Sequence, residues 1–298
     1  METADELRRV LGPFGIWMPP PARAGRGAEE YGREIEAAGF TSVWFPGMNS
    51  VADLASVEPM LAATNRLVLG TGIASVWTWT PAELARETNR LAAAYPGRFI
   101  LGLGVSHAPL VESTGQAYVK PYSKMVQFLD ELPEVTAPVV LAALAPKMLE
   151  LSRDRTLGAH PYFTPPEHTA FARRVLGAQP LLIPELAAAL TPGEEGAAAA
   201  RAYAKRYLAL PNYTSNLKRF GFTDADIAGA GSARLISQVV PNGPVAIATR
   251  LREHQAAGAD HVVVQLLTEG GAFDAGGLRA LADLIAELPE EETRSNLT

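Results

Sequence analysis

The sequence contains no cysteine, which excludes disulfide bonds, thiolate metal sites and a cysteine nucleophile. It has no basic face either, because 26 lysine and arginine residues are interspersed with 32 acidic residues, for a net charge of −6. A nucleic-acid partner is therefore not expected. No apolar run approaches the roughly 20 residues that a membrane-spanning helix needs, and the first residues lack the apolar core of a signal peptide. These absences predict a soluble, cytoplasmic protein that binds neither nucleic acid nor membranes.

Several catalytic and binding motifs are missing as well. No spacing of histidine, aspartate and glutamate is typical of a metal site, so we expect no metal ion. The G-x-S-x-G elbow of serine hydrolases is absent. The first predicted strand, residues 14–18, runs into Pro19, Pro20 and Pro21 rather than into the G-x-G-x-x-G turn of a dinucleotide-binding sheet. The sequence thus argues against an open doubly wound sheet.

What the chain of 298 residues does contain is a regular series of short apolar segments, in a composition that is 48% hydrophobic and 19% charged. Such a composition supports a large core and argues against disorder. Buried strands are predicted at residues 14–18, 43–45, 67–69, 98–104, 139–142, 157–160, 181–183 and 261–266. Helical patterns follow most of them, and eight strand–helix units in a chain of this length are the count of a (β/α)8 barrel.

We therefore predict a single α/β domain over residues 1–298 with the (β/α)8, or TIM-barrel, architecture. Residues from about 191 to 243 contain extra helical segments, which we interpret as a helical insertion between strands seven and eight. In a barrel of this kind, ligands bind where the strands reach their carboxyl ends. The residues just after each predicted strand are therefore the candidates for a functional site.

The third predicted strand leads into the most distinctive of these segments, residues 66–81. A Gly-Thr-Gly turn centred on Thr71 ends the strand, and Trp77 and Trp79 follow in alternation with threonines. Thr71 is a candidate hydrogen-bond donor to a ligand, and large aromatic rings stack on flat ligands and exclude water. The alternative is that both tryptophans pack against a neighbouring loop.

Two histidines directly follow predicted strands. Ser106 and His107 come after the fourth strand, and His160 and Tyr162 after the sixth. Because the ordinary pKa of histidine lies near working pH, His107 and His160 are candidates for general acid–base catalysis. Ser106 is a candidate cofactor contact, and Tyr162 a candidate pocket wall. The alternatives are a solvated loop histidine at position 107 and a hydrogen-bonded turn histidine at position 160.

Two further segments carry charge at a strand end. Leu144, Ala145, Pro146 and Lys147 follow the fifth strand and open a helix, whose free N–H groups suit a phosphate. The alternative is an ordinary helix that starts with proline. Glu185 follows the seventh strand as a candidate base or partner of a cationic substrate, and the alternative is a favourable charge at a helix amino terminus.

The remaining aromatic and histidine residues are interpreted as structural. Trp17 and Trp44 lie inside predicted strands, so we expect them in the core. His168 and His254 lie within predicted helices, and we expect them at the protein surface.

Four segments resemble the luciferase-like monooxygenase superfamily, and within it the branch of oxidoreductases that depend on coenzyme F420, a deazaflavin. They are EAAGFTSVWF at residues 36–45, LVLGTGI at 67–73, TPAELARETNRLAAAYPGRFILGLGVSH at 80–107 and GADHVVVQ at 258–265. The match runs nearly end to end, and YPGRFILGLG is its most specific piece. The excursion before the eighth strand fits too, because in this superfamily a helical segment there caps the barrel mouth.

The resemblance implies a (β/α)8 barrel, usually a homodimer, that binds F420 or FMN at the carboxyl ends of its strands. It also implies a cis peptide bond behind the flavin ring, which corresponds to Gly72–Ile73 here. Flavin phosphates are usually held around the loop that matches residues 144–147. Gly72 and Ile73 thereby join Thr71, Ser106 and that loop as cofactor-binding candidates.

One departure from the family pattern concerns the proton donor. Many F420-dependent relatives carry an acidic residue followed by histidine after the second strand, where this chain has Gly47 and Met48. The first hypothesis is an F420-dependent oxidoreductase that transfers a hydride between the deazaflavin and a small organic substrate, with His107 or His160 handling the proton. The second is an FMN-dependent monooxygenase on the same barrel. The third is a barrel that binds a cofactor without turnover.

Overall fold

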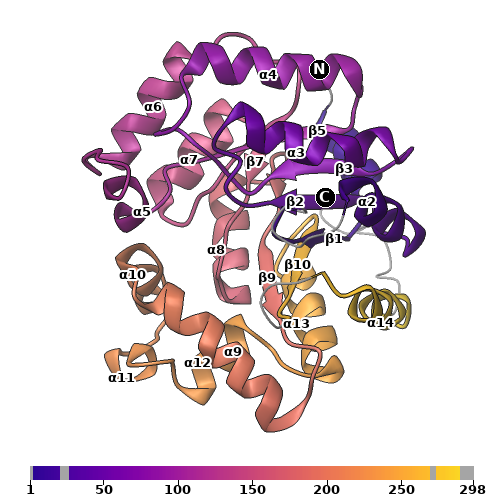
Figure 1. Ribbon diagram of the computed structural model, residues 1–298. Coiled ribbons are helices and arrows are strands. Elements are labelled where there is room, and N and C mark those ends of the chain that lie inside the picture. Colours follow the sequence, from indigo (N-terminus) through magenta and orange to yellow (C-terminus); the bar gives the residue numbers. More distant parts are fainter. Residues whose placement is uncertain (1–2, 21–26, 269–272, 289–298) are drawn as a thin grey trace.

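Strands and helices alternate along the computed structural model of the protein, which describes residues 3–20, 27–268 and 273–288. The strands form one parallel sheet, and helices surround it (Figure 1). Within the described ranges, no helix has the length and apolar character to cross a membrane. The first elements are α1 (Ala4–Leu11), β1 (Phe14–Trp17), α2 (Ala28–Ala37), β2 (Ser42–Phe45), α3 (Val51–Ala62), β3 (Val68–Thr71), β4 (Ala74–Ser75), α4 (Pro81–Ala94), β5 (Phe99–Gly104), α5 (Ala108–Glu112), α6 (Pro121–Glu131), β6 (Val139–Leu141) and α7 (Pro146–Arg155).

The second half of the chain adds shorter strands and a group of helices that stands apart. Its elements are β7 (Gly158–Ala159), α8 (Pro166–Leu176), β8 (Leu181–Leu182), β9 (Glu185–Ala188), α9 (Gly193–Leu208), α10 (Pro211–Arg219), α11 (Asp224–Ile227), α12 (Ala233–Val239), α13 (Pro244–Ala256), β10 (Val262–Leu266) and α14 (Ala275–Ala286). Figure 1 shows α9 to α12 in orange at the lower left, away from α2, α3 and α4. The predicted helical insertion before the last barrel strand is therefore confirmed.

The two ends of the sheet are β8 and β9, although only Ile183 and Pro184 separate them in the chain. Proline has no N–H group, and the chain changes its hydrogen-bonding partner at this point. The N–H of Ile183 donates to Ala159 of β7, whereas the carbonyl of Pro184 accepts from Val263 of β10. β8 and β9 are thus two halves of one barrel strand, and the sheet closes on itself. The predicted (β/α)8 barrel is confirmed.

Apolar side chains from all around the sheet meet inside the barrel. These interior side chains form one cluster, which also contains Leu7 and Leu11 of α1. The helix α1 therefore covers the barrel at the amino ends of the strands. Sequence analysis did not predict α1, which begins with a capping box between Thr3 and Glu6. The strands contribute Trp17, Trp44, Val68, Ile100, Val140, Leu181, Ile183 and Val263 to the cluster.

Trp44 fills the middle of the barrel because Gly70 on the neighbouring strand has no side chain. A Cβ atom at position 70 would overlap the Trp44 indole. The Trp44 Nε1–H donates to the Ser42 hydroxyl at 3.2 Å, and that hydroxyl lies 2.7 Å from Nε2 of His261. The polar atoms in this part of the interior are therefore hydrogen-bonded to one another. The predicted core position of Trp44 is confirmed.

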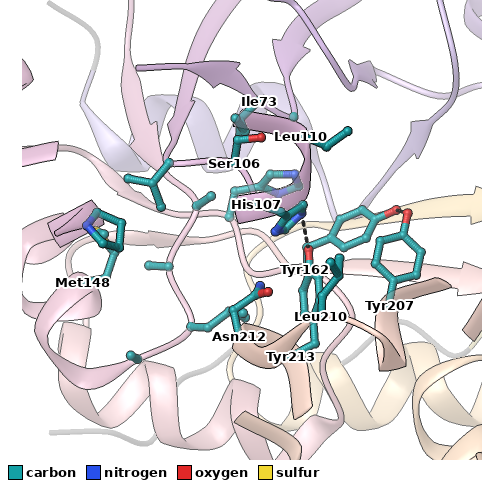
Figure 2. Close-up of a pocket in the computed structure, with 18 of the residues that line it drawn as sticks. Ile73, Ser106, His107, Leu110, Met148, Tyr162, Tyr207, Leu210, Asn212 and Tyr213 are labelled. Carbon is teal, nitrogen blue, oxygen red and sulfur yellow. Dashed lines mark hydrogen bonds between the residues drawn. The ribbon is translucent and has the colours of Figure 1, made fainter. Parts of the chain in front are cut away.

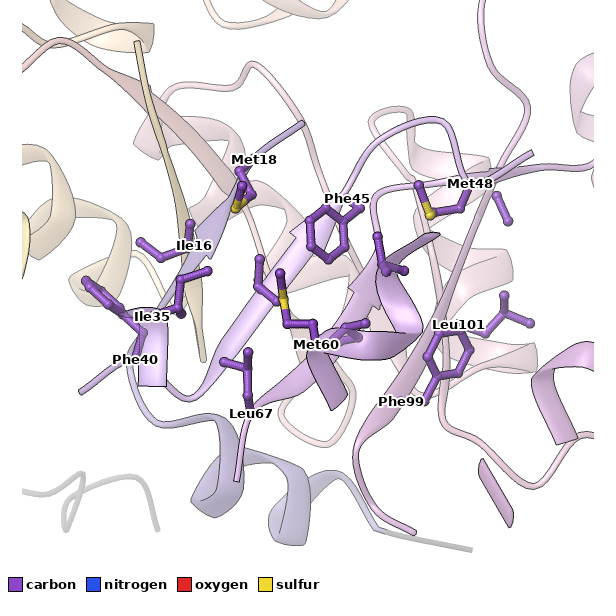
Figure 3. Close-up of a cluster of buried hydrophobic side chains, with 14 of the residues drawn as sticks. Ile16, Met18, Ile35, Phe40, Phe45, Met48, Met60, Leu67, Phe99 and Leu101 are labelled. Atoms are coloured by element: carbon purple, nitrogen blue, oxygen red, sulfur yellow. The ribbon is translucent and has the colours of Figure 1, made fainter. Parts of the chain in front are cut away.

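The outward side chains of the strands pack beneath the helices and form the larger part of the core (Figure 3). Ile16, Phe45 and Phe99 point outward, because neighbouring residues of a strand alternate between its two faces. α2 and α3 contribute Ile35 and Met60 to the same cluster. This shell fixes the strands, and their carboxyl ends form a rim on which loop residues are placed.

Two histidines that were expected at the surface are buried instead. His168 in α8 and His254 in α13 are both 0% exposed, so that prediction was wrong. The two helices pack against each other, and Nδ1 of His254 lies 2.8 Å from the Thr169 hydroxyl of α8. The pattern along a single helix does not reveal which second helix will cover it.

The contact between β3 and β5 offers a test of how tightly the barrel is built. The Thr71 hydroxyl donates to the Gly102 carbonyl at 2.8 Å and accepts from the Gly102 N–H at 2.7 Å. A Cβ atom at position 102 would overlap the Thr71 carbonyl oxygen, which cannot move unless the two strands separate. We expect Gly102→Ala to lower the free energy of unfolding by about 3 kcal/mol, measured by urea denaturation.

Gly39→Ala is the comparison variant for this experiment. Its Cβ would meet no atom within 4 Å, but the backbone φ of +92° disfavours alanine. We expect this variant to lose only about 1–2 kcal/mol. Equal losses in the two variants would contradict a steric constraint between β3 and β5.

Candidate functional site

A cavity of about 1160 Å³ opens at the carboxyl ends of the strands, between the barrel and the helical insertion (Figure 2). Loops after the barrel strands line one side, and α9, α10 and their connection line the other. The volume is above the roughly 300–1,000 Å³ of ordinary ligand pockets, so the cavity has room for a ligand larger than a typical small molecule. Of the residues predicted from the sequence, the lining includes Gly72, Ile73, Ser106, His107, Leu144, Ala145, Pro146, Lys147, His160 and Tyr162.

Trp17 and His160 lie next to Gly72 in the cavity wall. A Cβ atom on Gly72 would lie 3.0 Å from Nε1 of Trp17 and 3.1 Å from Nε2 of His160. Both nitrogens are buried, and neither has a hydrogen-bond partner among the residues that the structure describes. Because buried polar atoms are rarely left unpaired, an indole donor and an imidazole nitrogen beside one glycine point to a ligand.

His160 presents a hydrogen-bond acceptor to the cavity. Its Nδ1 lies 2.7 Å from the carbonyl oxygen of Ile183, so Nδ1 carries the proton and Nε2 has the free lone pair. Its ring stacks on Trp44 with the ring centres 4.8 Å apart. Burial lowers the pKa of His160 to about 4, although the bond to Ile183 acts in the opposite direction. The imidazole is therefore neutral at physiological pH.

The peptide bond between Gly72 and Ile73 is cis, as the resemblance implied. Both residues line the cavity just beyond the end of β3. The Ile73 side chain packs over Gly104, where a Cβ atom would lie 2.7 Å from its Cδ1 atom. The missing side chain at position 104 thus gives room for the turn that forms this part of the wall.

His107 follows a sharp turn after β5. The preceding residue, Ser106, has a φ of +55°, a value that is uncommon for a residue with a side chain. Nε2 of His107 lies 3.3 Å from the Tyr213 hydroxyl, and Figure 2 shows the two side chains facing each other. Nδ1 is buried and makes no well-formed hydrogen bond with any described residue. Burial lowers the pKa of His107, and a hydrogen bond from the imidazole to the side chain of Asn212 partly offsets this effect.

The amino terminus of α7 forms another part of the wall. Its N-cap residue, Ala145, has no side chain that could cap the helix, and Pro146 occupies the first turn. Lys147 is exposed and lines the cavity. Nε2 of His168 lies 3.0 Å from the Leu144 carbonyl and supports the loop from behind. Uncapped N–H groups, the helix dipole and a lysine together suit an anionic group.

A group of tyrosines closes the cavity on the side of the insertion. Tyr162 follows β7, Tyr203 and Tyr207 belong to α9, and Tyr213 belongs to α10. Tyr162, Tyr207 and Tyr213 line the cavity, whereas Tyr203 does not. The hydroxyls of Tyr162 and Tyr207 lie 2.8 Å apart. Figure 2 shows the two side chains with their hydroxyls next to each other.

Glu185 lies behind these tyrosines and does not line the cavity. It is the first residue of β9 and is 1% exposed, so the alternative of a charge at a helix start is wrong. The Phe163 N–H donates to its Oε2 atom at 3.3 Å, and the Tyr203 hydroxyl lies 3.4 Å from Oε1. Burial raises the pKa of Glu185 to about 8, against smaller lowering effects of these two contacts. The carboxyl group is therefore protonated at neutral pH.

Three other predicted site residues lie outside the cavity lining. The hydroxyl of Thr71 is used by the strand contact described above. Nε1 of Trp79 donates to the Met48 carbonyl at 2.8 Å, and its ring is buried in the core. Nε1 of Trp77 donates to the Val105 carbonyl at 2.8 Å. The structure gives all three a role in fixing the loops, not a place in the wall.

Several lining residues were not predicted from the sequence. Trp17 was interpreted as core, although its position at the end of a predicted strand was a usable signal. Asn49, Tyr207, Asn212 and Tyr213 also line the cavity. Apart from Asn49, they come from the insertion or its edge, and no local pattern indicates which of its side chains turn toward the barrel.

The loop between β2 and α3, residues 46–50, contains no acidic residue and no histidine. Gly47 lines the cavity, and Met48 is buried in the core. Among the described residues that line the cavity there is no aspartate or glutamate, and the described ranges hold no cluster of three metal-binding side chains. The ionisable side chains in the described wall are therefore histidines, tyrosines, one lysine and one arginine.

The sequence matches known proteins over part of its length. Residues 11–136 match the model of the luciferase-like monooxygenase family. A 5,10-methylenetetrahydromethanopterin reductase from Methanolobus tindarius is 26% identical over 41% of this chain and 45% of its own length. A Mycobacterium tuberculosis protein named among the coenzyme F420-dependent oxidoreductases is 32% identical over 46% of this chain and 38% of its own length. The matches thus span less than half of these two relatives.

Solved structures share the fold over nearly the whole chain. An F420-dependent secondary alcohol dehydrogenase, in complex with an F420–acetone adduct, is 15% identical with a TM-score of 0.65, covering 97% of this chain and 100% of its own. The F420-dependent tetrahydromethanopterin reductase of Methanopyrus kandleri is 15% identical with a TM-score of 0.66, and the match covers 93% of this chain and 97% of the reductase. The oxygenating constituent of 3,6-diketocamphane monooxygenase from Pseudomonas putida, solved in complex with FMN, is 14% identical with a TM-score of 0.66. The match covers 92% of this chain and 96% of the monooxygenase constituent. The family model and the two relatives confirm the predicted resemblance over part of the chain, residues 11–136 for the family model, and the solved structures confirm the fold.

The protonation states of the histidines provide a test of the site. The sequence has five histidines, and burial lowers the pKa of His160, His168 and His261 to about 4 and that of His254 to about 3. The pKa of His107 is lowered less, because this residue is less deeply buried. We expect NMR titration of the imidazoles to show His107 protonating first as the pH falls, with a midpoint below 6.5.

His107→Asn identifies the signal in that experiment, because it removes one imidazole resonance. A His107 midpoint above 6.5, or one below those of the other four histidines, would contradict the environment described for it.

Proposed function

We propose that this protein is an F420-dependent oxidoreductase, which transfers a hydride between the deazaflavin ring and a small organic substrate. The observation that carries the proposal is the large cavity at the strand ends, into which the unpartnered nitrogens of Trp17, His107 and His160 face. One relative in sequence and two solved structures with this fold carry F420 in their names, which supports the choice of cofactor. A homodimer in the cytoplasm is also part of the proposal and rests on the family resemblance alone.

The residues of the wall fit such a cofactor. A deazaflavin combines a flat ring, which has both donor and acceptor groups at its polar edge, with a phosphate-bearing tail. The Trp17 N–H and the His160 Nε2 lone pair offer one donor and one acceptor beside Gly72. The uncapped start of α7 and Lys147 would hold the phosphate. When bound, the deazaflavin supplies or takes up the hydride at its C5 atom.

We assign the proton-handling role at the cavity to His107. Nδ1 of this residue is buried and makes no well-formed hydrogen bond within the described part of the chain, while Nε2 is held by the Tyr213 hydroxyl. Because burial lowers its pKa, the imidazole is neutral at physiological pH and can both accept and donate a proton. His160 is less suited to this task, because its Nδ1 proton is committed to Ile183 and its pKa is near 4.

Titration of the purified protein with F420, followed by the change in deazaflavin absorbance or fluorescence, tests the cofactor. We expect binding at micromolar concentrations and a loss of affinity of roughly threefold to tenfold in Lys147→Ala, because an exposed charge contributes modestly. Lys205→Ala, on the exposed side of α9, is the matched control and should bind as the wild type does. Absence of binding at tens of micromolar F420 would contradict the proposal, and FMN that copurifies as a yellow chromophore would favour a monooxygenase.

Turnover tests the role of His107. Reduced and oxidised F420 are offered with a panel of small ketones and secondary alcohols, and the absorbance of oxidised F420 is followed. We expect His107→Asn to bind F420 within a few-fold of the wild type and to turn over roughly 10²-fold more slowly, as for loss of a general acid–base group. Unchanged turnover in this variant would refute the assignment. Tight F420 binding without turnover on any panel member would support a cofactor-binding barrel instead.

A further inference from the structure

The carboxyl group of Glu185 is the most deeply buried acidic group near the cavity. It is 1% exposed, and its described hydrogen-bond partners are the Phe163 N–H and the Tyr203 hydroxyl. Neither partner is a cation. An ionised carboxylate in such a place carries a large desolvation penalty, so the neutral acid is the stable form. Glu185 is therefore a protonated carboxyl group that lies behind the cavity wall and does not line the cavity.

The position of that proton follows from the two contacts. Oε2 accepts the Phe163 N–H, so it serves as an acceptor. The acidic proton then belongs on Oε1, which faces the Tyr203 hydroxyl at 3.4 Å. A hydroxyl can accept one hydrogen bond while it donates another. Tyr203 is thus the group that takes the proton from Glu185.

A continuous series of hydroxyls leads from Tyr203 to the cavity. The Tyr203 and Tyr162 hydroxyls lie 2.6 Å apart, and those of Tyr162 and Tyr207 lie 2.8 Å apart. The side-chain oxygen of Gln265 lies 2.8 Å from the Tyr203 hydroxyl and 3.0 Å from the Tyr162 hydroxyl, as a second acceptor for either proton. Because each hydroxyl has only one proton, it turns from Gln265 toward the next tyrosine when it passes that proton on. Tyr207 is only partly buried and lines the cavity, so the series ends there.

We propose that Glu185, Tyr203, Tyr162 and Tyr207 form a relay that delivers a proton from the barrel interior to a substrate oxygen in the cavity. The Glu185 proton moves to the Tyr203 oxygen, the Tyr203 proton to Tyr162, and the Tyr162 proton to Tyr207. The Tyr207 proton bonds to the substrate oxygen. The three tyrosines end as they began, the substrate gains one proton and Glu185 becomes a carboxylate. No electrons move in the relay. After the product leaves, a proton from solvent water enters at Tyr207 and passes along the same series in the opposite direction to restore the Glu185 acid.

The relay complements the hydride transfer of the proposed function, on which its physiological role rests. A hydride added to a carbonyl carbon leaves an oxygen that must take up a proton. The region after β2 has Gly47 where a donor was expected, and none of the described lining residues is acidic. A carboxyl donor behind the wall, reached through hydroxyls, supplies the acidic group that the wall itself lacks, in addition to the imidazole of His107.

The surroundings of Glu185 are polar but almost uncharged. Tyr203 and Tyr207 face it from α9, Tyr162 from the loop after β7, Tyr213 from α10 and Gln265 from β10. The cation of the group, Arg206, lies over the Tyr203 ring with its guanidinium 5.2 Å from the ring centre. Burial raises the pKa of Glu185 to about 8. The carboxyl group is therefore protonated and neutral before the reaction, and it can release its proton.

Infrared difference spectroscopy of the protein without cofactor tests the protonation of Glu185. We expect the carbonyl band of a protonated carboxyl group at pH 6, lost with a midpoint near pH 8 and absent from Glu185→Gln. A band that persists in Glu185→Gln, or a carboxylate at position 185 throughout this pH range, would overturn the proposal.

Exchange with D₂O tests the path. The isotope shift of the same band reports how fast the Glu185 proton exchanges, and we expect Tyr203→Phe to slow it roughly tenfold or more, because a phenyl ring cannot pass a proton. Tyr207→Phe breaks the path at its partly exposed end and provides a second test if Tyr203→Phe folds poorly. Tyr213→Phe removes a hydroxyl from the same cluster that is not in the relay, and its exchange should match the wild type.

Exchange at the wild-type rate in both Tyr203→Phe and Tyr207→Phe would refute the relay, and so would equal slowing in Tyr213→Phe. These measurements need no F420. Failure of F420 binding with slowed exchange would therefore refute the proposed function alone, whereas F420-dependent turnover with unaffected exchange would refute the relay alone.

Discussion

The hydrogen bond between Nδ1 of His160 and the Ile183 carbonyl joins the closure of the barrel to the construction of the site. Ile183 lies at the point where the seventh strand changes partner, so the bond holds the sheet together where it is interrupted. The same bond fixes the imidazole tautomer and leaves the Nε2 lone pair beside Gly72. The ring rests on Trp44, which fits only because Gly70 has no side chain. Gly70 in β3 thus makes room for Trp44, and Trp44 supports the His160 ring whose Nε2 atom is the acceptor in the cavity.

The upper part of the barrel places polar groups in an apolar setting and keeps them neutral. Burial lowers the pKa of His160 and raises that of Glu185, so both side chains lose their charge at neutral pH. The pKa values of Tyr162 and Tyr203 are also raised, chiefly by burial. Neutral groups avoid the desolvation penalty of ions and still donate and accept hydrogen bonds. This explains how a site for proton exchange is compatible with a tightly packed core.

The sequence was sufficient for the barrel because strands such as residues 98–104 are continuous apolar runs, a local property. It also located Ser106, His107 and His160, since every parallel strand ends at the same rim. It did not reveal that the hydroxyl of Thr71, which also lies at the end of a strand, donates its hydrogen bond to the Gly102 carbonyl and not to a ligand. Nor did it place Tyr207 and Tyr213, because the orientation of the insertion depends on contacts between segments far apart in the chain. Local patterns predict elements, whereas packing between elements decides which side chains reach the cavity.

The location of the proton source has a consequence for how the proposed chemistry is organised. The lysine and arginine in the cavity lining, Lys147 and Arg206, are both exposed, so water and salt screen them from a charge that develops inside. Proton delivery is then the effective way to neutralise a substrate oxygen. A donor after β2 would belong to the barrel alone, whereas Tyr203 and Tyr207 belong to the helical insertion that covers the cavity. Closing the cavity against water and supplying its proton therefore depend on the same helix, and a displacement of α9 would impair both at once.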